Sequence, residues 1–209
     1  MNKKCKIIIA IVFILALIAV GFFYYNKVQE DRMGPVSFES FKKTETDGKV
    51  FMENKDIGLK FMVPEGWGVQ NLTWSSISVV SQDFEPFTNP SPLPKKGCLI
   101  NINPEIQIEG SDYDLQYGDL KAMANDSNYL LLHNTDKEKY ESIELSELKG
   151  VKSDFLIDNN INNVGNRIYE AVPYNNVIYY FETSIFGENK EECLQEFDNF
   201  LTTVFIKKK

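Results

Sequence analysis

The segment GLKFMVPEGWGV, residues 58–69, is the part of the chain around which the rest is organised. Leu, Phe and Val occupy every second position from 59 to 63, which predicts a strand with one buried face. Pro64 and Gly66 then turn the chain, because proline cannot extend a hydrogen-bonded ladder and glycine accepts backbone angles that other residues avoid. The segment therefore predicts a strand, a tight turn and, in Trp67, a large side chain that anchors the next element.

The composition predicts a folded, acidic domain. Of 209 residues, 43% are hydrophobic and 13% aromatic, which is ample for a packed core. The net charge is −8, and the residues after 34 hold 17 basic and 28 acidic side chains, a net charge of −11. Such a domain repels phosphate backbones and anionic lipid headgroups, whose binding depends on Lys and Arg contacts. We therefore expect no nucleic acid among its partners.

The N-terminal segment predicts a membrane anchor. Residues 7–25, IIIAIVFILALIAVGFFYY, are 19 residues without a charge, and a helix rising about 1.5 Å per residue crosses a hydrocarbon core about 30 Å thick over that length. Three lysines precede the run, so the positive-inside rule places the N-terminus in the cytoplasm. A cleaved secretory signal is the alternative, although its apolar run is usually about 7 to 15 residues long. We expect a cytoplasmic N-terminus over 1–6, a transmembrane signal-anchor over 7–25, a stalk over 26–49 and an extracytoplasmic domain over 50–209.

The first half of that domain reads as strands and turns followed by one helix. We predict strands at 50–53 and 57–63, which form a hairpin, and at 76–81 and 98–103. Residues 83–97 hold four of the eight prolines and predict an irregular surface loop. Apolar residues at helical spacing, Tyr113, Tyr117, Leu120 and Ala124, predict a helix over 112–125.

The second half returns to strands and ends in a helix. Strands are expected from Tyr140, over 148–158 and over 166–173, with hairpin tips at 158–166 and 174–176. The run VIYYFETSIF, residues 177–186, is apolar on both faces and predicts a central strand. An apolar stripe from Cys193 to Val204 predicts a helix that packs on the sheet. The order predicts an α+β fold, a central antiparallel sheet flanked by helices.

Two of these segments carry a resemblance to a known family. The strand and turn GLKFMVPEGW, and the closing hairpin and helix from NRIYEAVPYNN to FLTTVFI, resemble the corresponding parts of the PsbP-like family of photosystem II and bacterial envelope proteins. Val204 stands where that family usually has phenylalanine. The resemblance spans about residues 50–207 and implies an α/β/α sandwich in proteins that bind other proteins without catalysis.

Catalytic and metal-binding patterns are sparse. His133 is the single histidine, and no sequence neighbour pairs it with a serine or cysteine nucleophile. Two acidic runs, 111–119 and 158–166, lack the glycine and glutamate that a calcium loop needs at its sixth and twelfth positions. We therefore expect no cofactor and no metal.

Cys98 and Cys193 are the cysteines of the exported part, one on a predicted strand and one on the final helix. Export permits a disulfide between them, and two separate buried thiols are the alternative. The residue pattern leaves both open.

Two functional hypotheses follow. The favoured one is a membrane-anchored, non-catalytic binding or accessory module that docks an envelope protein or cell-surface component through the proline-rich loop, with Trp74, Phe84 and Phe87 as candidate docking residues. Phe84 and Phe87 equally fit a role in pinning that loop to its own core. The alternative is an extracytoplasmic hydrolase or transferase that uses carboxylates, such as Asp83 with Glu85 or Asp112 with Asp114.

Overall fold

The structure is a computed structural model that describes residues 3–72, 76–84, 96–107, 109–110, 112–125, 140–155, 164–186 and 190–208. It divides into two compact units, Met1–Pro35 and Val36–Lys209. The first unit is one long helix, α1 (Lys3–Met33). A membrane-spanning helix is not found among the residues that the structure describes.

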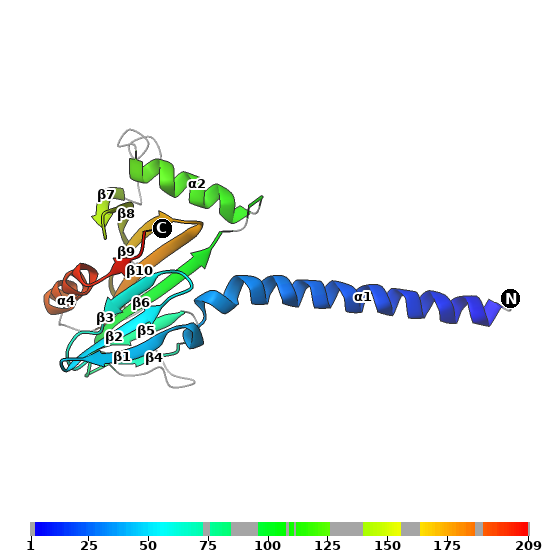
Figure 1. Ribbon diagram of the computed structural model, residues 1–209, viewed down its shortest axis with the longest axis horizontal. Coiled ribbons are helices and arrows are strands. Elements are labelled where there is room, and N and C mark those ends of the chain that lie inside the picture. The colour runs from blue at the N-terminus through cyan, green and yellow to red at the C-terminus, as the bar shows by residue number, and fades with distance from the viewer. Residues whose placement is uncertain are drawn as a thin grey trace. The chain divides into compact units, whose positions relative to one another are not determined.

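The second unit is built on a seven-stranded antiparallel sheet (Figure 1). Its strands, in spatial order, are β4 (Gly68–Gln70), β5 (Ile77–Val80), β6 (Gly97–Ile106), β10 (Val177–Phe186), β9 (Val164–Tyr174), β8 (Leu148–Phe155) and β7 (Tyr140–Leu145). β10 lies in the middle, between β6 and β9, as its two apolar faces predict. The expected hairpin tip at 174–176 is also present, with Asn175 and Asn176 at positive φ, whereas most of the tip at 158–166 lies outside the described residues.

A second, four-stranded antiparallel sheet corrects the prediction of one central sheet. Its order is β1 (Lys42–Thr46), β2 (Lys49–Asn54), β3 (Leu59–Met62) and β11 (Phe205–Ile206). The α+β class with antiparallel sheets is confirmed, and the hairpin of β2 and β3 forms as expected. The sequence does not predict this sheet, because the β1 sequence KKTET has no apolar face and β11 is only two residues long.

From Val36 onward, the segment before β1 belongs to the same unit as the two sheets. Two 3₁₀ turns, Gly34–Val36 and Phe38–Ser40, lead into the strand, and Val36 and Phe41 are buried in the core. Part of the expected stalk over 26–49 thus packs within the folded body.

The main core lies between the two sheets and the C-terminal helix α4 (Lys190–Thr202). Phe61 of β3, Phe181 of β10 and Phe197 and Phe200 of α4 are each at most 1% exposed. The Phe61 and Phe200 rings lie edge to face, 5.3 Å between centroids. Tyr179 joins the sheets directly, since its hydroxyl donates to the carbonyl of Ile57 at 2.6 Å.

Helix α2 (Asp112–Asn125) has the predicted bounds and covers the other face of the larger sheet. Its Leu120, Met123 and Ala124 pack with Val151, Ala171, Ile178 and Tyr180 from the strands below. Both faces of β10 are therefore covered, one by α2 and the other by the main core.

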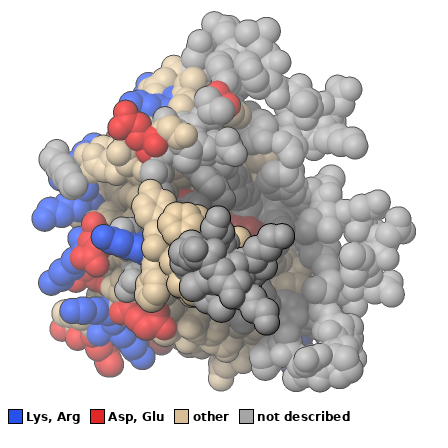
Figure 2. Space-filling view, turned by 90° about the vertical axis from the view of Figure 1, so that its right-hand side faces the viewer, with Lys and Arg blue, Asp and Glu red and all other residues tan. Residues whose placement is uncertain are grey.

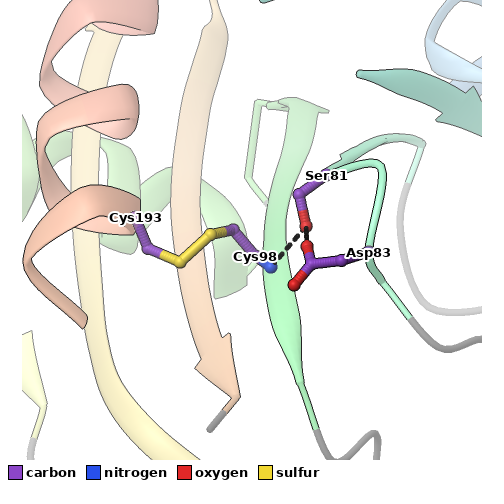
Figure 3. Close-up of a disulfide and its surroundings, with 4 residues drawn as sticks. All are labelled: Ser81, Asp83, Cys98 and Cys193. Carbon is purple, nitrogen blue, oxygen red and sulfur yellow. Dashed lines mark hydrogen bonds between the residues drawn. A yellow bond between two sulfur atoms is a disulfide. The ribbon is translucent and has the colours of Figure 1, made fainter. Parts of the chain in front are cut away.

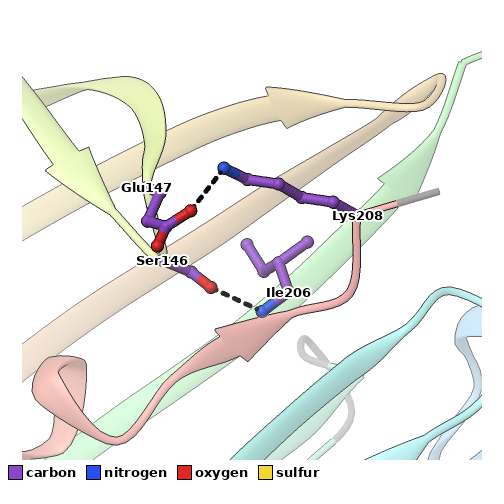
Figure 4. A network of polar contacts seen from close by, with 4 residues as sticks. All are labelled: Ser146, Glu147, Ile206 and Lys208. Carbon is purple, nitrogen blue, oxygen red and sulfur yellow. Dashed lines mark hydrogen bonds and ion pairs between the residues drawn. The ribbon is translucent and has the colours of Figure 1, made fainter.

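The C-terminal segment forms hydrogen bonds with the turn between β7 and β8 (Figure 4). Ser146 and Glu147 in this turn have positive φ, 51° and 59°, a conformation that costs free energy for residues other than glycine. The backbone N–H of Ile206 donates to Ser146 Oγ at 3.0 Å, and Lys208 Nζ donates to Glu147 Oε2 at 2.8 Å. This contact with Lys208 lowers the pKa of the Glu147 carboxyl. Ile206 itself is buried, so the end of the chain is part of the fold.

Candidate functional site

An open cavity of about 480 Å³ lies where the turn after β3, the end of β5, the start of β6 and helix α4 meet. Among the described residues that line it, four are carboxylates and none is lysine or arginine. The lining residues are Glu65, Gly66, Trp67, Ser81, Gln82, Asp83, Gly97, Cys98, Glu192 and Glu196. These come from three separate regions of the sequence.

The segment 58–69 supplies one wall. Pro64 ends β3, and the Trp67 backbone N–H donates to the Pro64 carbonyl at 3.1 Å, which closes a turn with Gly66 at a φ of 79°. Trp67 packs partly against the main core and against the cluster around Cys98 and Cys193. The predicted turn and anchor are thus what exposes Glu65 to the cavity.

Ser81 organises the second wall (Figure 3). Its hydroxyl donates to Asp83 Oδ1 at 2.7 Å and accepts from the backbone N–H of Cys98 at 2.9 Å. The Phe84 backbone N–H donates to the Ser81 carbonyl at 3.0 Å. One side chain therefore fixes both the Asp83 carboxylate and the start of β6.

Gly97 is required at this point. Its φ is 100°, and a Cβ added there would lie 2.6 Å from the Cα of Phe84. Only glycine permits the backbone at residue 84 to approach so closely. The two ends of the proline-rich loop are consequently held side by side at the cavity.

The third wall is α4, which a disulfide joins to the sheet. Cys98 and Cys193 are bonded in the structure, with Cα atoms 5.6 Å apart (Figure 3). Both are buried, and Cys98 lines the cavity. Glu192 and Glu196 are four residues apart on α4, so they lie on one face of the helix. Glu192 is in the first turn, where the helix dipole stabilises a negative charge.

The described lining residues of the cavity have the chemistry that suits a cation. Four carboxylates and an aromatic ring suit an ammonium or guanidinium group, by ion pairing and by cation–π contact. Among the described residues, no group of three or more His, Cys, Asp and Glu side chains could hold a metal ion. The cavity is open to solvent, which fits a side chain of another molecule.

The predicted site residues fall in different places. Phe84 is 8% exposed and packs with Val80, Leu99 and Phe186, its ring 6.1 Å from that of Phe186. Trp74, Phe87, Glu85 and His133 lie outside the described residues, as do the side chains of Asp112 and Asp114. Docking through the loop therefore stays a prediction. Of the three predicted docking residues, Phe84 is the one that the structure describes, and it is a core residue.

Sequence reasoning missed Glu65, Glu192 and Glu196. They come from a turn and a helix more than 100 residues apart, so no spacing brings them together. The sequence feature that could have predicted them is the cysteine pair. If Cys98 is bonded to Cys193, then Glu192 must lie near Gly97 and near the residues that pack on Gly97.

The fold and site define a class: an α+β protein with antiparallel sheets, helices on both faces of the larger sheet, and an acidic cavity at the root of a loop. Among solved structures, cyanobacterial PsbP from Synechocystis is similar, with 10% identity over 80% of this chain and 93% of its own, and a TM-score of 0.42. LpqN of Mycobacterium tuberculosis, described as involved in cell envelope biogenesis, has 11% identity over 80% of this chain and 92% of its own, and a TM-score of 0.43.

A protein of Bacteroides thetaiotaomicron has 10% identity over 73% of this chain and 46% of its own, with a TM-score of 0.42. No family model matches the chain, and no curated protein matches it in sequence. The comparisons therefore assign the chain to no family.

Proposed function

We propose that the chain is a membrane-anchored, extracytoplasmic module that binds a protein or another envelope component through the acidic cavity and has no catalytic activity. The observation that carries this proposal is the cavity itself, in which carboxylates from three regions of the chain surround one open space at the root of the 85–95 loop. The disulfide and the Ser81 hydrogen bonds hold these walls in place, so a partner finds the site already formed.

The anchor is the N-terminal run of 19 uncharged residues at 7–25. Its large apolar side chains between Ile11 and Tyr25 are 51–74% exposed on α1. Exposure of this much apolar surface is costly in water and favourable in lipid. With three lysines before it, the N-terminus lies in the cytoplasm and the domain outside. Retention of the full chain in membranes washed with alkaline carbonate, together with protease access to the domain from the outside, tests this part.

The binding role is tested by partner recovery from membranes. We expect the full chain to capture a partner that carries exposed Lys or Arg, and the pair Glu192→Gln and Glu196→Gln to reduce that capture severalfold, since an exposed ion pair contributes about 0.2–1 kcal/mol. The matched control is Glu191→Gln with Asp198→Asn, which removes two exposed carboxylates of the same helix that do not line the cavity. Equal recovery from both double variants would contradict the proposal.

The loop is tested separately. Replacing residues 85–95 by a Gly/Ser linker leaves Phe84 and Gly97 in place, so the cavity keeps its walls. If loop and cavity form one docking surface, the linker variant loses the same partner as the cavity variant. If only the cavity binds, recovery with the linker variant is unchanged.

A carboxylate hydrolase is the second candidate, and one observation favours it: Asp83, a member of a predicted catalytic pair, lines the cavity with three other carboxylates. An enzyme would lose turnover with Asp83→Asn while still binding its substrate. A binding module would instead lose affinity in proportion to the charge removed. Measuring both on the same variant, with the captured envelope component as substrate, separates the two.

A further inference from the structure

The four-stranded sheet has one face in the core and one face in solvent. Strand register places Met52, Phe61 and Ile206 on the inner face, where they are buried. The outer face, which we call the lysine face, carries Lys42, Lys49, Phe51, Lys60, Phe205 and Lys207.

Phe205 is the unusual member of the lysine face. Among the described residues from Val36 onward, it is the one large apolar side chain that is exposed, at 55%. It borders a cavity of about 340 Å³ that Lys60 and Lys207 also line. Beside it, Lys60 Nζ lies 4.8 Å from the centroid of the Phe51 ring. In the register, Lys60 is paired with Phe205 on one side, and its amine lies over the Phe51 ring on the other.

The charge of this face is opposite to that of the domain. Four lysines share it with one carboxylate, Glu53, which lies between Lys42 and Lys60 in the register. In the space-filling view, Lys and Arg side chains are interspersed with Asp and Glu along the left-hand side (Figure 2), so the excess of lysine on this face is given by the register. A local positive charge on a domain of net charge −11 selects an anionic partner and fixes which face approaches it.

The tether favours a lipid surface as that partner. Eight residues, 34–41, lie between the end of α1 at Met33 and the start of β1, and eight residues reach at most about 29 Å when fully extended. If α1 spans the membrane, the start of β1, which carries Lys42 of the lysine face, stays within about 29 Å of the end of that helix. Exposed phenylalanine flanked by lysines is also the composition of surfaces that enter the headgroup region.

We propose that the lysine face lies on the anionic lipid surface of the membrane that holds α1, with Phe205 inserted among the headgroups. The proposal rests on the anchor of the proposed function. It adds an orientation to that function, because docking by this face sets the direction in which the rest of the domain points.

The test places a tryptophan at the contact. The full chain with Phe205→Trp is reconstituted into phosphatidylcholine vesicles with and without about 30% phosphatidylglycerol, and quenching by brominated lipid is measured. The matched control is Gln195→Trp, at an exposed position of α4. Trp67 and Trp74 fluoresce in every variant, so quenching is compared with that of the wild type. We expect added quenching from the residue-205 reporter and none from the residue-195 reporter, stronger with phosphatidylglycerol and weakened by salt.

Charge removal supplies the second readout. Each lysine near an anionic surface contributes about fivefold to binding, so Lys49→Gln with Lys207→Gln lowers the docked-to-free ratio about 25-fold. Lys121→Gln with Lys149→Gln removes two exposed lysines from other elements and leaves quenching unchanged. Equal quenching in both lipid mixtures, or equal loss in both double variants, overturns the proposal.

Two outcomes separate this inference from the anchor. If carbonate releases the full chain but the residue-205 reporter is still quenched, the anchor fails and the lysine face docks by itself. The second outcome has three parts: the chain stays in the membrane, the residue-205 reporter is not quenched, and the lysine variants lose capture of an acidic protein. In that case the anchor stands and lipid docking is overturned.

Discussion

Replacing Tyr179 by phenylalanine tests how the two sheets are held together. Tyr179 is fully buried in β10, and its hydroxyl donates at 2.6 Å to the carbonyl of Ile57, which lies 122 residues away in the turn between β2 and β3. Phenylalanine keeps the ring and nearly all the volume, so no large cavity forms. The loss is that of one hydrogen bond and a buried carbonyl left without that donor, about 1–3 kcal/mol at pH 7.

The same variant has a signature at high pH. Burial raises the pKa of Tyr179, and the nearby phenols of Tyr174 and Tyr117 add to the effect. Because the folded-state pKa lies above the unfolded value of about 10, the neutral phenol stabilises the fold fully below pH 10, and this stability is lost as pH rises toward the folded-state pKa. At pH 11 the wild type loses about 1.4 kcal/mol from this residue, and the phenylalanine variant loses none from it.

The assay is urea unfolding of the full chain in detergent solution, followed by tryptophan fluorescence at pH 7 and between pH 9.5 and 11. Tyr25→Phe, in the exposed part of α1, is the control and leaves the domain's unfolding unchanged. The free-energy difference between wild type and Tyr179→Phe narrows as pH rises. A difference below about 0.3 kcal/mol at pH 7, or one that stays constant up to pH 11, would refute the reasoning.

Two further predictions concern the cavity walls. Gly97→Ala destabilises the domain by at least about 2 kcal/mol, because the new Cβ would lie 2.6 Å from the Cα of Phe84. Gly118→Ala, in open space on α2, instead stabilises it by about 0.5–1 kcal/mol. Thermal unfolding measures the stability of both variants. Alkylation before reduction modifies neither Cys98 nor Cys193 in mass spectrometry, and alkylation of both in the unreduced protein would exclude the bond. Replacing both by alanine lowers stability by about 4–5 kcal/mol, since the disulfide joins residues 95 apart.

The elements that the sequence predicted correctly are those whose pattern is local. Helix α2 has the predicted bounds, and β10 has the predicted pair of apolar faces because ten consecutive side chains show them. The second sheet was missed because pairing of β11 with β3 joins Phe205 to Lys60, and no local pattern records such a register. β1 lies within the segment predicted as a stalk, for which a strand at its end was left open. It is an edge strand whose exposed lysines, glutamate and threonines read as linker, although such charges also protect an edge from pairing with other chains.

The candidate site was less predictable than the fold. Its carboxylates have no common spacing, and only the cysteine pair linked the regions that supply them. Phe84 was predicted, but its role was ambiguous, since an aromatic residue beside a loop suits both docking and the core. Its burial with Leu99 and Phe186 supports a role in the core. Aromatic content alone could not separate the two, because it says nothing about which side chains the fold covers.

Net charge conceals the property that both proposals depend on. A domain of −11 should avoid anionic surfaces, yet its acidic side chains include the four of the cavity while lysines predominate on the outer face of the small sheet. Each surface is held by contacts distant in sequence: the cavity by the bond between Cys98 and Cys193, and the lysine face by β11, whose Ile206 is anchored to Ser146. Salt would weaken binding at both surfaces, but lipid composition would affect only the second. That difference allows one protein, in one set of vesicles, to report separately on what its cavity binds and on how the domain rests on the membrane.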